Sequence, residues 1–131
     1  GNLKYQHYDD TGCYHYDYTD EMRDQLLKDM IPYKGKFRLY NDTDTNFMND
    51  HDFTESKYSF VHFDGPHMTK DVMTEAIWFA NRSAPTTRFV FDDFPKYNMQ
   101  LIRDVLKLYG FEIMDQGQNK ICLEKIERVV L

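Results

Sequence analysis

The sequence predicts an α/β domain whose sheet is mostly parallel and ends in an antiparallel hairpin. Two apolar runs, 58–63 and 88–91, have the character of central strands, and the segment between them fits one helix and two loops. That spacing is typical of a βαβ unit, in which two parallel strands deliver their last residues to the same edge of a sheet. Two strand-like runs around a turn at 116–118 predict the final hairpin.

The expected elements alternate between strand and helix, which favours an α/β arrangement. Thr19, Thr69 and Asn98 are placed to cap helices, and Gly110 is suited to end the last one. From residue 13 the expected order is strand 13–18, a helix ending before Pro32, strand 36–40, a polar loop over 41–54 with room for a helical turn, strand 58–63, helix 69–82, strand 88–91, a helix from 98 to 109, and a hairpin of 111–114 with 119–125.

Composition excludes several classes of protein. A chain of 131 residues that is 41% apolar and 16% aromatic fits one globular domain over residues 1–131 rather than a disordered chain. A formal net charge of −6 argues against a nucleic-acid partner, because phosphate binding needs clustered Lys and Arg. No apolar run is long enough to span a membrane, and no secretory signal is visible, so a cytoplasmic location is expected.

Three aspartates follow the two central strands. Asp64 comes directly after the run 58–63, while Asp92 and Asp93 follow the run 88–91. If the strands are neighbours, about 4.8 Å apart, the three carboxylates converge and repel one another unless protons or a cation intervene. A divalent ion with oxygen ligands would resolve that repulsion. The alternative is that these residues only cap the helices that follow or bind loop amides.

The segments around these aspartates resemble a known family, class I S-adenosylmethionine-dependent methyltransferases. The nearest likeness is to the carboxyl half of metal-dependent sugar O-methyltransferases of the macrocin type, with catechol O-methyltransferases as cousins. The resemblance covers roughly residues 13–125 and is specific over 58–111. It implies a truncated Rossmann-like methyltransferase sheet. The residues that carry it are Phe63-Asp64-Gly65-Pro66-His67, Phe91-Asp92-Asp93-Phe94 and Tyr109-Gly110-Phe111.

The resemblance implies a metal site and a base. By position, Asp64, Asp92 and Asp93 would hold a divalent cation, Mg²⁺ for example. The sugar enzymes carry a proposed base two residues after the first metal aspartate, where this chain has Pro66. His67 falls where the catechol enzymes carry a lysine, and it could act as a base near neutral pH.

The resemblance also implies residues for S-adenosylmethionine. The acidic residue that binds the cofactor's ribose falls on Asp17. The loop that touches adenine falls on Asn41, Asp42 and Thr43.

One expected part of the family's fold is missing. A first strand and a glycine-rich loop should precede residue 13, yet none of the six glycines forms a G-x-G. The chain is then a fragment, or its sheet has closed up, or residues 4–8 supply a substitute strand. S-adenosylmethionine binding by this chain alone is therefore expected to be weak or absent.

Two functions from different classes follow. One is metal-assisted O-methyl transfer from S-adenosylmethionine to a hydroxyl of a sugar or small diol. The other is a non-catalytic methyltransferase-like domain that serves as an interaction or structural module. The expected partner is a small hydroxyl-bearing molecule, and a homo-oligomer stays open. A zinc site built from His62, Asp64 and His67 is a weaker alternative, because no fourth ligand is in view.

Overall fold

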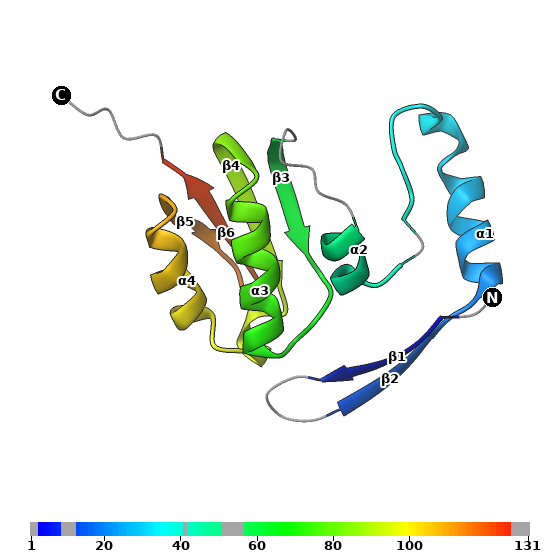
Figure 1. Ribbon diagram of the computed structural model, residues 1–131, viewed down its shortest axis with the longest axis horizontal. Helices are drawn as coiled ribbons and strands as arrows, with labels where there is room; N and C mark the ends of the chain where they lie inside the picture. The colour runs from blue at the N-terminus through cyan, green and yellow to red at the C-terminus, as the bar shows by residue number, and fades with distance from the viewer. Residues whose placement is uncertain (1–2, 9–12, 41, 51–56, 127–131) are drawn as a thin grey trace.

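The computed structural model describes residues 3–8, 13–40, 42–50 and 57–126, with side chains from residue 19 onward. In chain order the strands and helices are β1 (Leu3–Tyr8), β2 (Cys13–Tyr18), α1 (Asp20–Asp29), η1 (Ile31–Tyr33), α2 (Asp44–Asp50), β3 (Tyr58–Phe63), α3 (Thr69–Ala80), β4 (Ser83–Asp92), η2 (Phe94–Lys96), α4 (Met99–Lys107), β5 (Phe111–Gln116) and β6 (Lys120–Lys125). Figure 1 shows α3 and α4 together on one face of a sheet formed by β3 to β6.

The central sheet is mixed, with the strand order β3-β4-β6-β5. β3 and β4 are parallel neighbours, as the βαβ spacing predicts, and β5 and β6 form the predicted antiparallel hairpin. β6 also pairs antiparallel with β4. The α/β class is therefore confirmed, but the prediction of a mostly parallel sheet is wrong, because β3 and β4 are the one parallel pair among the described strands.

The amino-terminal strands do not extend this sheet. β1 and β2 pair antiparallel with each other, from Leu3 opposite Tyr18 to Tyr8 opposite Cys13, and Figure 1 shows this hairpin apart from the four-stranded sheet. Residues 4–8 thus form a strand, but not one that fills a gap beside β3. The predicted strand at 36–40 is wrong: the segment has no strand partner, and Leu39 is 42% exposed. A strand without a neighbour leaves its backbone groups unpaired, so alternating sequence alone does not hold it.

The core lies between the sheet and the two covering helices. Side chains along β4 alternate, so Phe89 and Phe91 are buried against the helices while Arg88 is exposed. Two stacked ring pairs cross the strands: Phe63 with Phe91 at a centroid distance of 4.4 Å, and Phe89 with Phe111 at 4.3 Å. The helices contribute buried side chains at helical spacing, namely Val72, Ala76 and Ala80 from α3 and Met99, Ile102 and Leu106 from α4.

Helix caps follow the sequence at two of the three predicted positions. The Thr19 hydroxyl accepts a hydrogen bond from Met22 N at the start of α1, and the Asn98 side chain accepts one from Leu101 N at the start of α4. The Thr69 prediction is wrong, because the N-cap of α3 is Met68. The Thr69 hydroxyl instead accepts a bond from Asn98 N at 2.9 Å, which ties the starts of α3 and α4 together.

In the described part of the chain, no helix has the length and apolar character needed to cross a membrane.

β4 begins at Ser83 rather than at residue 88, and Pro85 lies inside it. Thr87 is fully buried there, and its hydroxyl lies 2.6 Å from the carbonyl oxygens of both Tyr58 and Ala84. These contacts hold β3 and β4 together where their register is irregular.

Replacing Phe89 with Ala should cost about 3–5 kcal/mol of the free energy of unfolding, because a fully buried aromatic side chain leaves a cavity. The matched control is Phe60→Ala on β3, where the ring is 58% exposed, and it should cost less than about 1 kcal/mol. Urea unfolding measures both values. Equal losses for the two variants would contradict the assignment of the core to the helix-covered face.

Candidate metal centre

Parallel pairing brings the predicted aspartates together. Phe63 on β3 lies opposite Phe91 on β4, so the next residues, Asp64 and Asp92, leave the sheet at the same edge. Asp64, Asp92 and Asp93 each offer one carboxylate oxygen, and these three oxygens lie within 4.8 Å of one another. Such a cluster of hard oxygens matches the ligands that Mg²⁺ and Ca²⁺ prefer in proteins.

The backbone at Asp93 explains how two consecutive residues reach one site. Successive side chains of a strand point to opposite faces, so an extended chain would send Asp93 away from Asp92. Asp93 instead adopts a left-handed conformation with φ of 53°, a region that residues other than glycine seldom occupy. The chain turns there into η2. Strain of this kind, at roughly 1–3 kcal/mol, tends to collect at functional sites.

The buried side chain of Tyr97 stabilises this turn by hydrogen bonding. The Tyr97 hydroxyl donates a hydrogen bond of 2.9 Å to the backbone oxygen of Asp92. Burial, and then the negative charges of Asp92 and Asp93, raise the pKa of Tyr97 far above its usual value, so its hydroxyl keeps its proton. Tyr97 is therefore a hydrogen-bond donor that positions the Asp92–Asp93 backbone.

The pKa values of the Asp64 and Asp92 carboxyls are shifted in opposite directions. Burial raises the pKa of Asp64, and a hydrogen bond with Asp92 and the negative charge of Asp92 raise it further. The pKa of Asp92 is lowered, chiefly by a hydrogen bond from Lys120. Asp64 is therefore the carboxyl of the pair that keeps its proton more readily, and Asp92 is the one that ionises more readily, as expected for two carboxyls in one small volume.

Lys120 is the residue of this site that the sequence did not reveal. It begins β6, directly opposite Asp92 in the antiparallel register, and its Nζ lies 3.0 Å from Asp92 Oδ1. The same Nζ lies 3.0 Å from His62 Nε2. An ammonium group thus supplies positive charge at the place where a cation is predicted. Only the register of β6 against β4 could have pointed to it, and no local motif encodes that register.

His67 lies next to the third aspartate. Its Nε2 is 3.4 Å from Asp93 Oδ2, its side chain is 13% exposed, and neither ring nitrogen has a hydrogen-bond partner in the described structure. The Lys96 ammonium approaches the same Asp93 oxygen at 4.0 Å. A sheltered imidazole beside a carboxylate is suited to accept a proton from a bound hydroxyl. The structure therefore brings His67 to the same edge as the aspartates.

The residues expected to hold S-adenosylmethionine do not gather at this edge. Asp17 lies in β2, within the separate hairpin, and Asn41 lies outside the described residues. Asp42 and Thr43 directly precede α2. The Asp42 carboxylate accepts hydrogen bonds from Thr43 N and Asn46 Nδ2, and the Thr43 hydroxyl accepts one from Asn46 N. Their local role is helix capping, and their predicted cofactor contacts stay predictions.

No protein-family model matches the chain, and no curated protein or solved structure matches it either. The likeness to methyltransferases therefore rests on the sequence segments around Asp64 and Asp92. We therefore infer a function from the geometry of the three aspartates, His67 and Lys120.

Replacing Lys120 with Met should raise the pKa of Asp92, because the hydrogen bond and positive charge that favour its ionised form are removed. Carbon-13 NMR titration of the side-chain carboxyls measures this pKa. The matched control is Lys107→Met on the exposed surface of α4, which should leave it unchanged. An unaltered Asp92 titration in the Lys120 variant would show that Lys120 does not contact this carboxylate in solution.

Proposed function

We propose that Asp64, Asp92 and Asp93 bind a divalent cation, with Mg²⁺ or Ca²⁺ preferred over Zn²⁺. The observation that carries this proposal is the convergence of three carboxylate oxygens within 4.8 Å at the ends of two parallel strands. A bound cation would take the place of the proton shared by Asp64 and Asp92 and relieve their repulsion. No thiolate belongs to the cluster, which favours a hard ion.

The same centre suits O-methyl transfer to a hydroxyl of a sugar or small diol, the activity of the family that the sequence resembles. A divalent cation, when bound, polarises a hydroxyl and lowers its pKa. His67 is the candidate base, since its partly sheltered ring lies beside Asp93 and neither of its nitrogens has a hydrogen-bond partner in the described residues. Lys120 has to leave Asp92, or stay outside the first coordination sphere, when the ion binds.

The described residues do not fit S-adenosylmethionine. Asp42 and Thr43 already accept hydrogen bonds within the start of α2, and β2, which carries Asp17, pairs only with β1. No G-x-G sequence is present to let the backbone approach the cofactor. We therefore assign no step to the cofactor, and methyl transfer by this chain would need a further segment or a partner to complete its site.

The second candidate function is a non-catalytic module. Lys120 favours it, because an internal ammonium that neutralises Asp92 makes a metal ion unnecessary for stability. The amino-terminal helix favours it as well. α1 has no buried residue, and its apolar Met22, Leu26 and Leu27 are exposed. Apolar side chains gathered on one helix are typical of an interaction surface.

Millimolar Mg²⁺ or Ca²⁺ should raise the melting temperature of the protein, because an ion that binds only the folded state stabilises it by mass action, by about 2.7 kcal/mol at 100 times the dissociation constant. Asp92→Asn should abolish this shift while leaving the protein without metal folded but slightly less stable, since the ion pair with Lys120 is lost. Thermal unfolding followed by circular dichroism measures the shift.

The matched control for the metal experiment is Asp104→Asn, which removes an exposed carboxylate of α4 that contacts Gln100. This variant should keep the full metal-induced shift. If the unmodified protein melts at the same temperature with and without both ions, the metal proposal fails and the non-catalytic module stands.

Calorimetric titration with S-adenosylmethionine should give weak binding or none, with or without Mg²⁺. The physical reason is the missing glycine-rich turn together with the scattered positions of Asp17, Asp42 and Thr43. A dissociation constant in the low micromolar range, about −8 kcal/mol, would contradict this expectation. It would mean that other residues of the chain build the cofactor site.

A further inference from the structure

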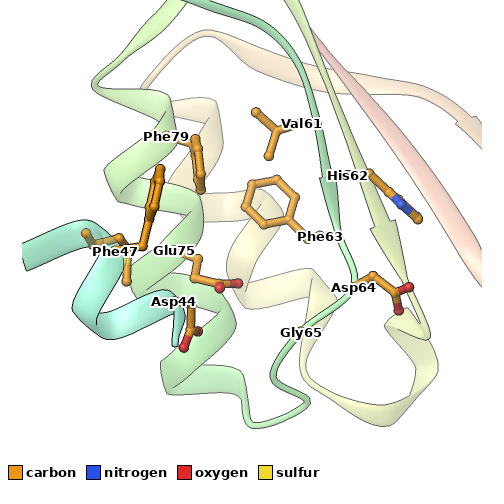
Figure 2. A pocket seen from close by; sticks show the side chains of 10 residues that line it. Asp44, Phe47, Val61, His62, Phe63, Asp64, Gly65, Glu75 and Phe79 are labelled. Carbon is orange, nitrogen blue, oxygen red and sulfur yellow. The ribbon is translucent and has the colours of Figure 1, made fainter. Parts of the chain in front are cut away.

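A cavity lies beside the end of β3, and Asp64 and His62 are among the residues that line it. Its volume is about 340 Å³, and it opens between α2, α3 and the end of β3 (Figure 2). In Figure 2, His62 and Asp64 point to one side of β3, whereas Val61 and Phe63 point to the other, toward Glu75 on α3. The cavity therefore adjoins the candidate metal centre, because Asp64 belongs to both, but the Glu75 carboxyl lies on the other side of β3 from the side chain of Asp64.

Glu75 is an unusual residue to find in this cavity. It is only 8% exposed, and Figure 2 shows its carboxyl directed toward Asp44 on α2. Its Oε1 also lies close to Gly65, where an added Cβ would be 3.7 Å away. Among the described residues no N–H group or basic side chain pairs with Glu75, and its one hydrogen-bonding neighbour, Asp44, is another acid.

The surroundings of Glu75 make the cavity electronegative. Burial raises the pKa of Glu75 to about 9, and the hydrogen bond with Asp44 and the charges of Asp44 and Asp71 act in the same direction. No basic group offsets these effects, in contrast to Asp92 with Lys120. A buried carboxyl without a donor or cation is costly. Glu75 and Asp44 therefore share a proton at neutral pH, and a ligand cation could take the place of that proton.

The remaining walls of the cavity are largely apolar and aromatic. Phe47 from α2 and Phe79 from α3 line it, with Val61 and Phe63 from β3. Aromatic faces attract cations as well as apolar groups. The rings of Phe47 and Phe79 both make edge contacts with the ring of Trp78, at centroid distances of 5.9 Å and 4.9 Å. The contact between Phe47 and Trp78 packs α2 against α3 and so maintains the shape of the cavity.

We propose that this cavity binds a small primary amine in its ammonium form, with the charge between Glu75 and Asp44 and the apolar body against Phe47 and Phe79. A metal ion fits less well, because Ca²⁺ takes six to eight oxygen ligands and the walls here are mainly carbon. A neutral apolar ligand carries no charge that could take the place of the proton shared by Glu75 and Asp44. The cavity volume is near the lower end for small-molecule sites, roughly 300–1,000 Å³.

Benzylamine is the probe, and benzyl alcohol is its neutral counterpart of nearly the same size. Amide chemical shifts in nitrogen-15 NMR spectra, followed during titration at pH 7, give the site and the affinity. Benzylamine should shift the amides of Gly65, Glu75 and their neighbours on α2 and α3 to saturation. Benzyl alcohol should bind at least tenfold more weakly, because it carries no charge.

Two variants test the acid pair. Glu75→Gln keeps the shape of the side chain but removes the acid, and Asp44→Asn does the same at the exposed end of the cavity; each should weaken benzylamine binding at least tenfold. The matched control is Asp104→Asn on the exposed surface of α4, which is not among the cavity-lining residues and should change the affinity less than twofold. Melting temperatures establish that each variant is folded.

Three results would overturn the proposal. The first is equal binding of benzyl alcohol and benzylamine, and the second is unchanged benzylamine affinity in both acid variants. The third is a Ca²⁺-induced shift that survives Asp92→Asn and disappears in Glu75→Gln, with no response to benzylamine, which would assign the cavity to a metal. Since the aspartate centre is tested through Asp92, failure of either proposal leaves the other unaffected.

Discussion

The parallel pairing of β3 with β4 is the constraint on which the rest of the structure depends. It aligns Phe63 with Phe91 beneath α3, and the stacked rings of these residues form the middle of the core. The same register then delivers Asp64 and Asp92 to one edge. Shifting one strand by a single residue would reverse both faces, so the core and the acidic cluster exist together or not at all.

The negative charge of the Asp64–Asp92 pair and that of the Glu75–Asp44 pair are compensated in different ways. At the edge of the sheet, the ammonium of Lys120 lowers the pKa of Asp92, whereas burial and the neighbouring Asp92 raise the pKa of Asp64. On the side of β3 that faces α3, Glu75 and Asp44 have no cation within the described structure, and Glu75 stays protonated at neutral pH. The first site is thus partly satisfied by the protein itself, whereas the second depends on a proton or a ligand.

Local pattern predicted the central half of the chain well. Strand 58–63 and the cap at Asn98 are confirmed residue for residue, because their apolar runs and capping groups act over a few positions. Prediction was less successful for segments whose structure depends on pairing with a strand that is distant in the sequence. Residues 36–40 alternate like a strand but have no neighbouring strand, and the strand predicted for 88–91 begins at Ser83 instead, with Pro85 inside it. Pairing between distant segments leaves no local trace in the sequence.

The sequence by itself determined that two acidic strand ends flank a helix, and with it the parallel pair and the meeting of Asp64, Asp92 and Asp93. Those features follow from strand length, helix spacing and the handedness of βαβ crossovers. Only the tertiary structure decided that Lys120 lies beside Asp92, that β2 pairs with β1, and that Glu75 is buried against Asp44. Each of these depends on which surfaces exclude water together, a property of the packed chain and not of any one segment.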